Sequence, residues 1–323
     1  MSRIYYIATR AHRYTLTHWF DPPPGAEDPR VVPVAYDEID RFEGRELPEA
    51  IYVFTDLDRL DAAGMKTAVA LADRVRATGG RRHVANWPNR VWTRTELLAR
   101  LHARGANDFT CYRFGEHRQI ARFPVFLRVL GRHGGPATWL LADRTELDTA
   151  LRQLLARGTR RDDILVVEYL DSDRVAGRFL TYGAFCAWGR VFPADITFSA
   201  SWIAKYDARH EDESTARFEA DWVQRNPHAA AIAAVFAAAG VDWGRVDYTL
   251  RNGRLQVFEI NTNPDLVSPT TWANEARRIA HVIPVELANI RRAFRRLAAP
   301  PPERPGSHLA DEGAEARADG QPV

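Results

Sequence analysis

Two pairs of polar side chains between residues 244 and 264 have the types and spacing to bind a hard cation. The segment reads GRVDYTLRNGRLQVFEINTNP, in which Arg245 and Asp247 lie two residues apart, as do Glu259 and Asn261. In a strand, residues two apart project from the same face. Two carboxylates and an amide could form an oxygen cage for a hard cation, with the positive charge of Arg245 beside it. The alternative reading is an amphipathic hairpin whose charges face water.

The connection between the two strands decides whether the two acids can cooperate. Asn252-Gly253 is a common two-residue hairpin turn. In that register Asp247 would lie opposite Phe258, and Asp247 and Glu259 would project from opposite faces of the hairpin. Such an arrangement would exclude a shared cation.

A three-residue loop over residues 251–253 shifts the register by one position. Asp247 and Glu259 then become diagonal neighbours on one face, and Arg245 lies opposite Glu259. Glycine suits the left-handed position that ends such a loop. We predict this register or an equivalent bulge, because a shared cation requires a shared face.

The combination R-x-D followed by E-x-N-x-N-P resembles the ATP-grasp superfamily, in particular carboxylate–amine ligases of the D-alanine–D-alanine ligase type. The resemblance implies ATP as a cofactor and Asp247, Glu259 and Asn261 as ligands of Mg²⁺, with Mn²⁺ as the alternative ion. It also implies a catalytic role for Arg245 near the reacting phosphate or carboxylate. The implied fold class is mixed α/β (α+β): an N-terminal parallel α/β domain followed by a two-lobed ATP-grasp domain with antiparallel sheets.

The composition is that of a soluble globular protein with room for two or three subdomains. The chain has 323 residues and a net charge of +2, and its arginines form no basic tract, which disfavours nucleic acid as a partner. Its two cysteines form no disulfide framework or metal-like spacing. Neither a signal peptide nor a membrane-spanning segment is expected, so we expect a cytoplasmic protein.

The first part of the chain alternates strands and helices, which favours parallel strands. We expect strands at 3–9, 50–55 and 83–86, a helix at 61–77 and a surface loop at 20–33. We assign residues 1–92 to an N-terminal α/β domain, which the resemblance makes the domain that precedes ATP-grasp.

The ATP-grasp domain is expected at 93–298, with an N lobe at about 93–170 and a C lobe at about 171–298. Capping boxes at Thr93/Glu96 and Asp143/Glu146 predict two helices. The strand at 123–130 carries Arg128 where the superfamily usually has a lysine that contacts ATP phosphate. A glycine-rich segment follows at 131–135, for which a phosphate-binding loop and a simple turn are both open.

The strand ILVVEYL, residues 164–170, resembles the hinge between the two lobes of ATP-grasp enzymes. The resemblance implies that Glu168 accepts a hydrogen bond from the adenine amino group and that the backbone near Tyr169 and Leu170 meets the ring. Asp171, or Asp173 beyond it, would reach the ribose. Lys205 could bind phosphate as a compact charge, or lie in a solvated loop.

The C lobe is expected to contain strands at 178–187 and 190–198, an acidic helix at 211–222 and the metal hairpin. Asn226-Pro227 reads as the start of a further helix that runs to Gly240. Helical stretches at 274–281 and 284–297 follow. Residues 299–323 lack periodic apolar positions and are expected to be disordered.

The function implied by the resemblance is ATP-dependent ligation with release of ADP. A substrate carboxylate would be activated as an acylphosphate and attacked by an amine or another nucleophile. The partners are therefore small-molecule or peptide carboxylates and amines, with no nucleic acid and no membrane. The alternatives are a small-molecule kinase on the same scaffold and a non-catalytic ATP-binding regulator. The sequence does not define the oligomeric state, for which a homodimer is one option.

Overall fold

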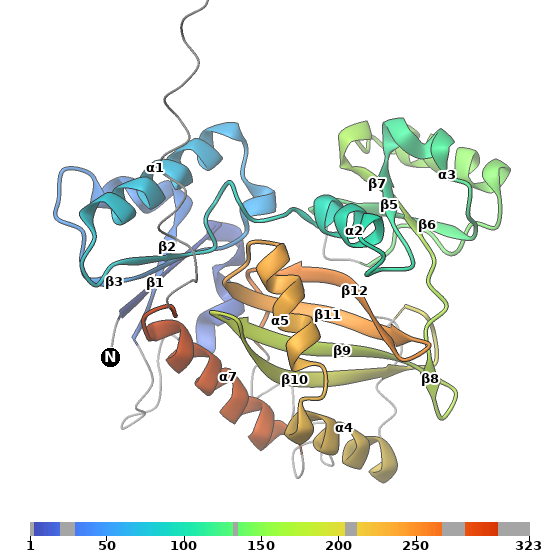
Figure 1. The fold of residues 1–323 in the computed structure, drawn as a ribbon. Coiled ribbons are helices and arrows are strands. Elements are labelled where there is room, and N and C mark those ends of the chain that lie inside the picture. Colours follow the sequence, from blue (N-terminus) through green and yellow to red (C-terminus); the bar gives the residue numbers. More distant parts are fainter. Residues whose placement is uncertain (1–2, 20–29, 132–134, 204–211, 267–281, 303–323) are drawn as a thin grey trace, which may run out of the picture.

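The computed structural model describes residues 3–19, 30–131, 135–203, 212–266 and 282–302. Three β-sheets organise these residues, one parallel and two antiparallel (Figure 1). The predicted fold class, a parallel α/β unit followed by antiparallel sheets, is confirmed. Within the described parts of the chain, no helix has the length and apolar character needed to cross a bilayer.

The first sheet is fully parallel and has the strand order β2-β1-β3-β4. Its elements are β1 (Arg3–Ala8), β2 (Val31–Ala35), β3 (Ala50–Phe54), β4 (His83–Ala85), the 3-10 helices η1 (Arg10–Trp19), η2 (Tyr36–Phe42) and η3 (Leu57–Arg59), and α1 (Ala62–Thr78). Asp61 caps α1 by accepting a hydrogen bond from the Gly64 N–H. Residues of β1 and β3 are buried almost throughout, as expected for strands covered on both faces.

The predicted loop at 20–33 is wrong at its end, because β2 already begins at Val31. Pro33 lies within β2 and is paired with Tyr6 of β1. A proline in a central strand would leave one neighbouring strand without an N–H donor, but β2 is the edge of its sheet and is paired on one side only. Residues 20–29 lie outside the described residues.

The second sheet is antiparallel, with the order β5-β7-β6. Its elements are α2 (Arg94–Ala103), β5 (Cys111–Arg113), η4 (Phe114–Gln119), β6 (Val125–Val129), α3 (Arg144–Ala156), η5 (Arg161–Asp163) and β7 (Ile164–Glu168). The capping box of α2 is confirmed: Thr93 Oγ1 accepts from the Glu96 N–H, and Glu96 accepts from the Thr93 N–H at 2.9 Å. Asp143 caps α3, whereas Glu146 accepts from the Ala142 N–H.

The third sheet is antiparallel and has the order β10-β9-β11-β12, with β8 paired to β9. Its elements are β8 (Arg174–Val175), β9 (Arg178–Ala187), β10 (Arg190–Ser199), α4 (Glu213–Arg225), α5 (Ala229–Ala238), β11 (Trp243–Arg251), β12 (Arg254–Asn261) and α7 (Ile283–Ala298). Asn226 adopts φ 48° and ends α4, so the prediction that it starts the next helix is wrong. Asparagine tolerates the left-handed conformation of a helix C-terminus.

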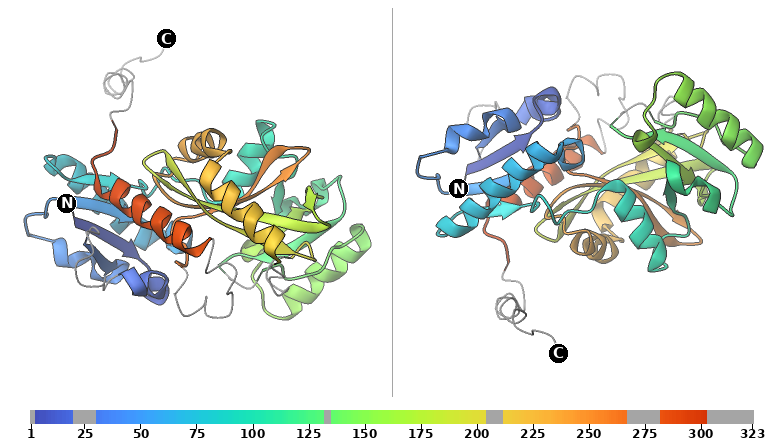
Figure 2. Two further views of the ribbon diagram at one scale, coloured as in Figure 1. Left: turned by 90° about the horizontal axis from the view of Figure 1, so that it is seen from below. Right: turned by 90° about the horizontal axis from the view of Figure 1, so that it is seen from above.

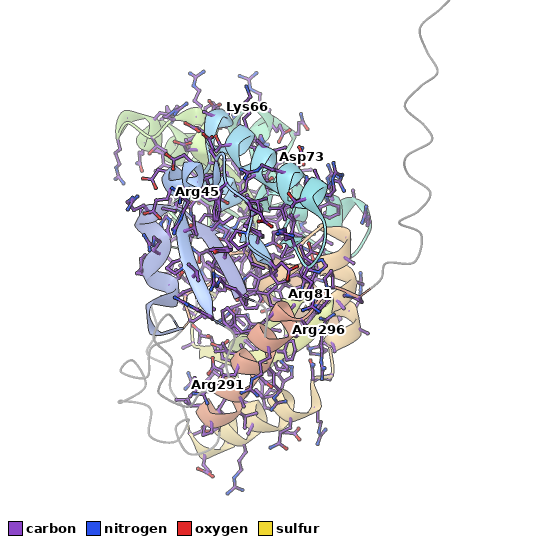
Figure 3. The ribbon with its side chains drawn as sticks, turned by 90° about the vertical axis from the view of Figure 1, so that its left-hand side faces the viewer. Arg45, Lys66, Asp73, Arg81, Arg291 and Arg296 are labelled. Atoms are coloured by element: carbon purple, nitrogen blue, oxygen red, sulfur yellow. The ribbon has the colours of Figure 1, made fainter. Side chains whose placement is uncertain are left out.

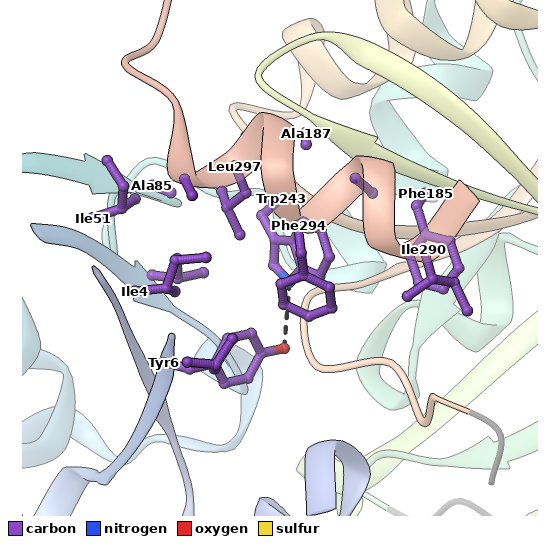
Figure 4. Close-up of a cluster of buried hydrophobic side chains, with 14 of the residues drawn as sticks. Ile4, Tyr6, Ile51, Ala85, Phe185, Ala187, Trp243, Ile290, Phe294 and Leu297 are labelled. Atoms are coloured by element: carbon purple, nitrogen blue, oxygen red, sulfur yellow. Dashed lines mark hydrogen bonds between the residues drawn. The ribbon is translucent and has the colours of Figure 1, made fainter. Parts of the chain in front are cut away.

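The first and third sheets share one hydrophobic core, which α7 closes (Figures 2 and 4). In it the Trp243 Nε1–H donates to the Tyr6 hydroxyl at 3.3 Å, as Figure 4 shows. Fully buried Asn86 joins the same two sheets, because its side chain donates to the carbonyls of Phe54 and Trp243 and accepts from the Trp243 N–H. The second sheet has cores of its own. The predicted domain limits stay predictions.

Candidate functional site

The hairpin of β11 and β12 brings the two predicted acids face to face, by a different route from the one predicted. The turn is the two-residue Asn252-Gly253, with φ 51° and 70°, so the three-residue loop is wrong. The register is corrected by a bulge instead, and Asp247 is paired directly with Glu259. Arg245 consequently lies opposite Asn261 and not opposite Glu259.

The bulge consists of one extra residue in β12, Phe258. Val257 pairs with Tyr248, and Glu259 pairs with the preceding residue of β11, Asp247, which leaves Phe258 without a partner. Phe258 and Glu259 therefore both line one cavity, although regular alternation would send neighbours to opposite faces. The equivalent bulge in the prediction is thus what the hairpin contains.

A segment from outside the hairpin fixes this bulge. The buried side chain of Asn107 donates to the Val257 carbonyl at 2.8 Å and accepts from the Val257 N–H at 2.9 Å. The adjacent Asp108 N–H donates to Gln256 Oε1 at 2.7 Å. These bonds pair the free edge of β12 immediately before the bulge, so the position of Glu259 depends on residues that follow α2.

Arg245 is held between two carboxylates on the same face of the sheet. Its Nε donates to Asp247 at 3.0 Å, and its terminal nitrogen donates to buried Asp195 of β10 at 2.8 Å. Burial alone would lower the pKa of Arg245, but Asp195, Asp247 and Glu286 raise it above its ordinary value. Arg245 is therefore a permanent cation that orients Asp247.

Gly183 of β9 provides the space for this ion pair. It is paired with Asp247 on one side and faces an irregularity of β10 between Pro193 and Ile196 on the other. A Cβ at Gly183 would lie 2.7 Å from Arg245 Cζ and would also collide with Asp195. The glycine is required by this close approach, since its φ is not left-handed.

Arg94, which no sequence motif marks, contacts one of the predicted metal ligands, Glu259. It is the first residue of α2, and its guanidinium forms an ion pair with Glu259. Burial lowers the pKa of Arg94, and the carboxylates of Asp58 and Asp247 partly offset this effect. No local motif marks Arg94, because the capping box predicts only the helix that carries it.

Arg128 of β6 is the second cation that the fold brings here. Its backbone belongs to the β6–β7 ladder, but among the described residues its side chain makes no hydrogen bond and no ion pair. Burial, and then the nearby charge of Arg94, lower the pKa of Arg128 to about 10. Two desolvated guanidinium groups near each other favour the entry of an anion such as phosphate.

A first cavity, the aromatic cavity, has a volume of about 180 Å³ and lies between the second and third sheets. Its aromatic lining residues are Phe109, Phe126, Tyr169, Phe179, Trp202 and Phe258. The Trp202 ring lies 4.9 Å from that of Phe126 and 5.8 Å from that of Tyr169. Asp247, Glu259, Arg94 and Arg128 line the same cavity. It therefore combines a surface for a planar ring with a charged region.

A second cavity, the charged cleft, has a volume of about 120 Å³ and lies between the first sheet and the rest of the molecule. Residues 56–59, after β3, form one wall, and Asn261 and Thr262 belong to another. Arg94, Arg128 and Glu259 line both the charged cleft and the aromatic cavity. The two cavities thus meet at the predicted metal ligands.

The predicted hinge residues lie at the aromatic cavity. Glu168, Tyr169 and Leu170 line it, and Asp171 lies just outside its described lining. The buried Glu168 carboxylate already accepts hydrogen bonds from the Tyr112 hydroxyl at 3.0 Å and the Thr110 N–H at 3.3 Å. It also pairs with Arg122 at 2.8 Å. Its predicted contact with adenine would use the lone pairs that remain.

Asp173, the other acid considered for the ribose, binds the turn of the β11–β12 hairpin. Its carboxylate accepts from the Asn252 N–H at 2.8 Å and from the Gly253 N–H at 2.9 Å. Replacing Asp173 with alanine is expected to lower the free energy of unfolding by about 1 kcal/mol, because both turn donors lose their partner. Urea unfolding and the KM for ATP would be measured for Asp173→Ala and for Asp171→Ala, which removes the acid expected at the ribose and should raise the KM with little effect on stability. A raised KM with unchanged stability in Asp173→Ala would contradict this structural role.

The three polar residues of E-x-N-x-N divide into two roles. Asn261 lies on the same face as Glu259, and its Oδ1 accepts from the Asn263 N–H at 2.9 Å. Buried Asn263 points away toward the first sheet, where its side chain donates to Asp56 at 3.0 Å and accepts from Thr15 at 2.7 Å. The motif therefore combines candidate metal ligands with an anchor to the first sheet.

The described residues contain no group of three or more His, Cys, Asp or Glu side chains placed to hold a metal ion. The predicted set has two carboxylates and one amide, and all three side chains lie on one face of the hairpin. These oxygens suit Mg²⁺, which is bound in proteins by one or two carboxylates together with water and phosphate oxygens. Lys205 lies outside the described residues, as do residues 132–134 of the glycine-rich segment.

No protein-family model matches this sequence, and no curated protein matches it significantly. Several solved structures resemble the chain trace. A D-alanine–D-alanine ligase from Bacillus anthracis complexed with ATP is 14% identical, with a TM-score of 0.48 over 90% of this chain and 99% of that one. An L-amino acid ligase from Bacillus licheniformis is 14% identical, with a TM-score of 0.47 over 91% and 75%.

The ATP-grasp ligase PsnB, complexed with a phosphomimetic variant of a minimal precursor, Mg and ADP, is also similar. It is 14% identical, with a TM-score of 0.49 over 91% of this chain and 97% of that chain. The superfamily that the motifs resemble is therefore represented among the solved structures with a similar chain trace. At these identities the likeness concerns the trace alone, and the chemistry has to follow from the residues of the site.

Proposed function

We propose that this chain is an ATP-grasp ligase, which uses ATP and Mg²⁺ to activate a substrate carboxylate as an acylphosphate for attack by an amine or another nucleophile. The observation that carries the proposal is the pairing of Asp247 with Glu259 where the aromatic cavity meets the charged cleft. This arrangement gives a place for a nucleotide on one side and for a second substrate on the other.

The aromatic cavity would bind the adenine ring, with Glu168 and the backbone near Tyr169 and Leu170 at its edge. Asp171 would reach the ribose, and Lys205 would add a further phosphate contact. Arg128 supports a phosphate role, because it is desolvated and has no ion-pair partner among the described residues. Phosphate would satisfy that charge in the bidentate geometry that arginine allows.

Asp247, Glu259 and Asn261 would hold Mg²⁺, with Mn²⁺ as the alternative ion. A metal bound there would neutralise charge on the phosphate oxygens. Arg245 would act by fixing Asp247, since its guanidinium already binds Asp195 and Asp247. Arg94, paired with Glu259, would contribute positive charge on the side of the charged cleft.

The reaction would have two steps. A carboxylate oxygen of the first substrate forms a bond to the γ-phosphorus of ATP while the bond to the ADP oxygen breaks. The nucleophile then attacks the acyl carbon, inorganic phosphate leaves, and the proton of the nucleophile passes to solvent. The side chains form no covalent bond to the substrates in these steps. They position the substrates and stabilise negative charge. A cytoplasmic location is part of this proposal.

Release of ADP in the presence of hydroxylamine tests the proposal. The full-length protein would be incubated with ATP, MgCl₂ and a panel of carboxylic acids and peptides. We expect ADP only with a substrate carboxylate, and a hydroxamate in equal amount, because hydroxylamine attacks the acylphosphate. A stable phosphorylated product without hydroxamate would show a kinase. ATP binding without ADP across the panel would show a regulator, and either outcome would reject the ligase.

A further inference from the structure

The charged cleft contains equal numbers of acids and arginines. After the ion pairs among them are formed, one acid and one arginine remain without a partner in the cleft. The six charged residues are Asp56, Asp58, Glu259, Arg59, Arg94 and Arg128. Asp56 lies 3.6 Å from Arg59, and Glu259 pairs with Arg94. Within the described part of the chain, the side chains of Asp58 and Arg128 make neither a hydrogen bond nor an ion pair, and the Asp58 carboxylate acts on the Arg94 guanidinium only at longer range. The cleft therefore presents one carboxylate and one guanidinium to whatever enters it.

Asp58 is carried by a short backbone segment that is fixed on both sides. The preceding Asp56 adopts φ 53°, which is uncommon for a residue with a side chain, and its carboxylate accepts from the Thr9 N–H at 3.0 Å. The Asp56 N–H donates to Thr262 at 3.2 Å, and Arg59 on the other side donates to the Gly131 carbonyl at 3.2 Å. The contacts on both sides hold the segment at the wall of the cleft, while the Asp58 side chain is exposed.

We propose that Asp58 is the counterion for a primary ammonium group of the substrate that enters the charged cleft. The inference rests on the ligase proposed above and deepens it, because it names the residue of this chain that would bind the amine substrate. The unpaired Arg128 lines both the charged cleft and the aromatic cavity. A substrate whose ammonium group binds Asp58 would therefore occupy the same cleft as the predicted phosphate-binding Arg128.

The selectivity of this arrangement follows from desolvation. A substrate that fills a cleft of about 120 Å³ removes water from the Asp58 carboxylate. An ammonium group replaces that water with a charged hydrogen bond, whereas a methyl group or a neutral ether leaves the acid unsatisfied. A site built around a charged group rejects the analogue that lacks it more strongly than an apolar pocket does.

Binding of a matched pair of small probes tests this inference without turnover. L-Alaninamide carries an ammonium group at about pH 6.5, and L-lactamide carries a hydroxyl in its place. Binding to the full-length protein would be measured by saturation-transfer NMR titration in the absence of ATP. We expect wild type to prefer alaninamide, and Asp58→Asn to weaken alaninamide binding by about tenfold with lactamide unchanged. Asp58→Glu should restore most of the preference.

Asp73→Asn provides the matched control. Asp73 is an exposed acid on α1, as Figure 3 shows, is paired with Arg76 and is not among the residues that line the cleft. This variant should bind both probes like wild type. Equal binding of the two probes to wild type, or an unchanged preference in Asp58→Asn, would overturn the inference.

The binding test can reject the ammonium site without rejecting the ligase, and the activity test can reject the ligase without rejecting the ammonium site. If Asp58→Asn loses the preference for alaninamide but no carboxylate elicits ADP, the ammonium site stands and the ligase is rejected. If wild type forms amide products and Asp58→Asn has the same KM for the amine, the ligase stands and the ammonium site is rejected. If both hold, the KM for the amine should rise about tenfold in Asp58→Asn with the KM for ATP unchanged.

Discussion

Replacing Glu259 with glutamine is expected to lower ATP-dependent turnover by about 100- to 1,000-fold while the protein stays folded. The substitution keeps the shape of the side chain and removes the charge that lies opposite Asp247 and against Arg94. Folding should change little, because Glu259 and Arg94 are both partly exposed and a pair of this kind contributes about 1 kcal/mol or less. ADP release and urea unfolding would be measured on the same preparation.

Two features make this experiment specific to the metal assignment. Glu213→Gln, on the exposed face of α4, also removes one carboxylate from an ion pair with an arginine and should leave turnover unchanged. The MgCl₂ concentration that gives half-maximal ADP release should rise in Glu259→Gln, since a ligand of the ion has been weakened. Full activity of Glu259→Gln at the Mg²⁺ concentration used for wild type would refute the assignment of Glu259.

Replacing Asp195 with alanine is expected to lower the free energy of unfolding by about 3 kcal/mol, because it removes one partner from a buried ion pair. Asp195 is 3% exposed and Arg245 is 17% exposed, so neither group is well screened by water. Arg245 would keep Asp247 as its remaining hydrogen-bonding carboxylate and would be drawn toward it. Urea unfolding would give the loss of stability, and MgCl₂ titration of turnover would report the changed position of Asp247. A loss below about 0.5 kcal/mol would show that the pair contributes no more than a surface ion pair.

A second variant separates the position of Arg245 from its charge. In Gly183→Ala all the charges remain, but the new Cβ would meet the guanidinium of Arg245 and the carboxylate of Asp195. We expect a loss of about 1–3 kcal/mol from overpacking, together with the same rise in the Mg²⁺ requirement. Gly115→Ala is the matched control, because a Cβ there meets nothing within 4 Å and the residue has no left-handed φ.

The interpretation of Arg245 changes with the structure. The R-x-D pattern suggests that Arg245 is a cation that faces the reacting groups. In the structure the Arg245 guanidinium binds Asp195 and Asp247, and Arg245 is not among the described residues that line the two cavities. Arg94 and Arg128 line both cavities. In the proposed reaction these two residues supply the positive charge that faces the two cavities, and Arg245 holds Asp247 in position.

The elements that the sequence predicts correctly are those with a local physical cause. The α2 helix begins where Thr93 and Glu96 can cap it, and Asp61 and Asp143 cap α1 and α3 in the same way. The Asn252-Gly253 turn also has a local cause, but the prediction set it aside for a three-residue loop and was wrong there. The elements it misses depend on partners elsewhere. Pro33 is compatible with β2 only because that strand has an edge position, and Asn226 ends α4 because the chain turns there through a left-handed residue.

The site itself divides in the same way. The sequence alone determined the candidate metal ligands, because Glu259 and Asn261 are two residues apart and project from one face of their strand, and Asp247 supplies a second carboxylate on the preceding strand. It also required that the two acids share a face. The tertiary structure decided how they do so, through a bulge at Phe258 that Asn107 fixes from another segment.

Only the folded chain brings Arg94, Arg128 and Asp58 to the hairpin, because each is carried by a different element and the contact between them is set by the packing of whole sheets. Periodicity and capping depend on residues a few positions apart, so they can be read from the sequence. The charge balance of a cleft depends on side chains far apart in the chain, so only the tertiary structure determines it.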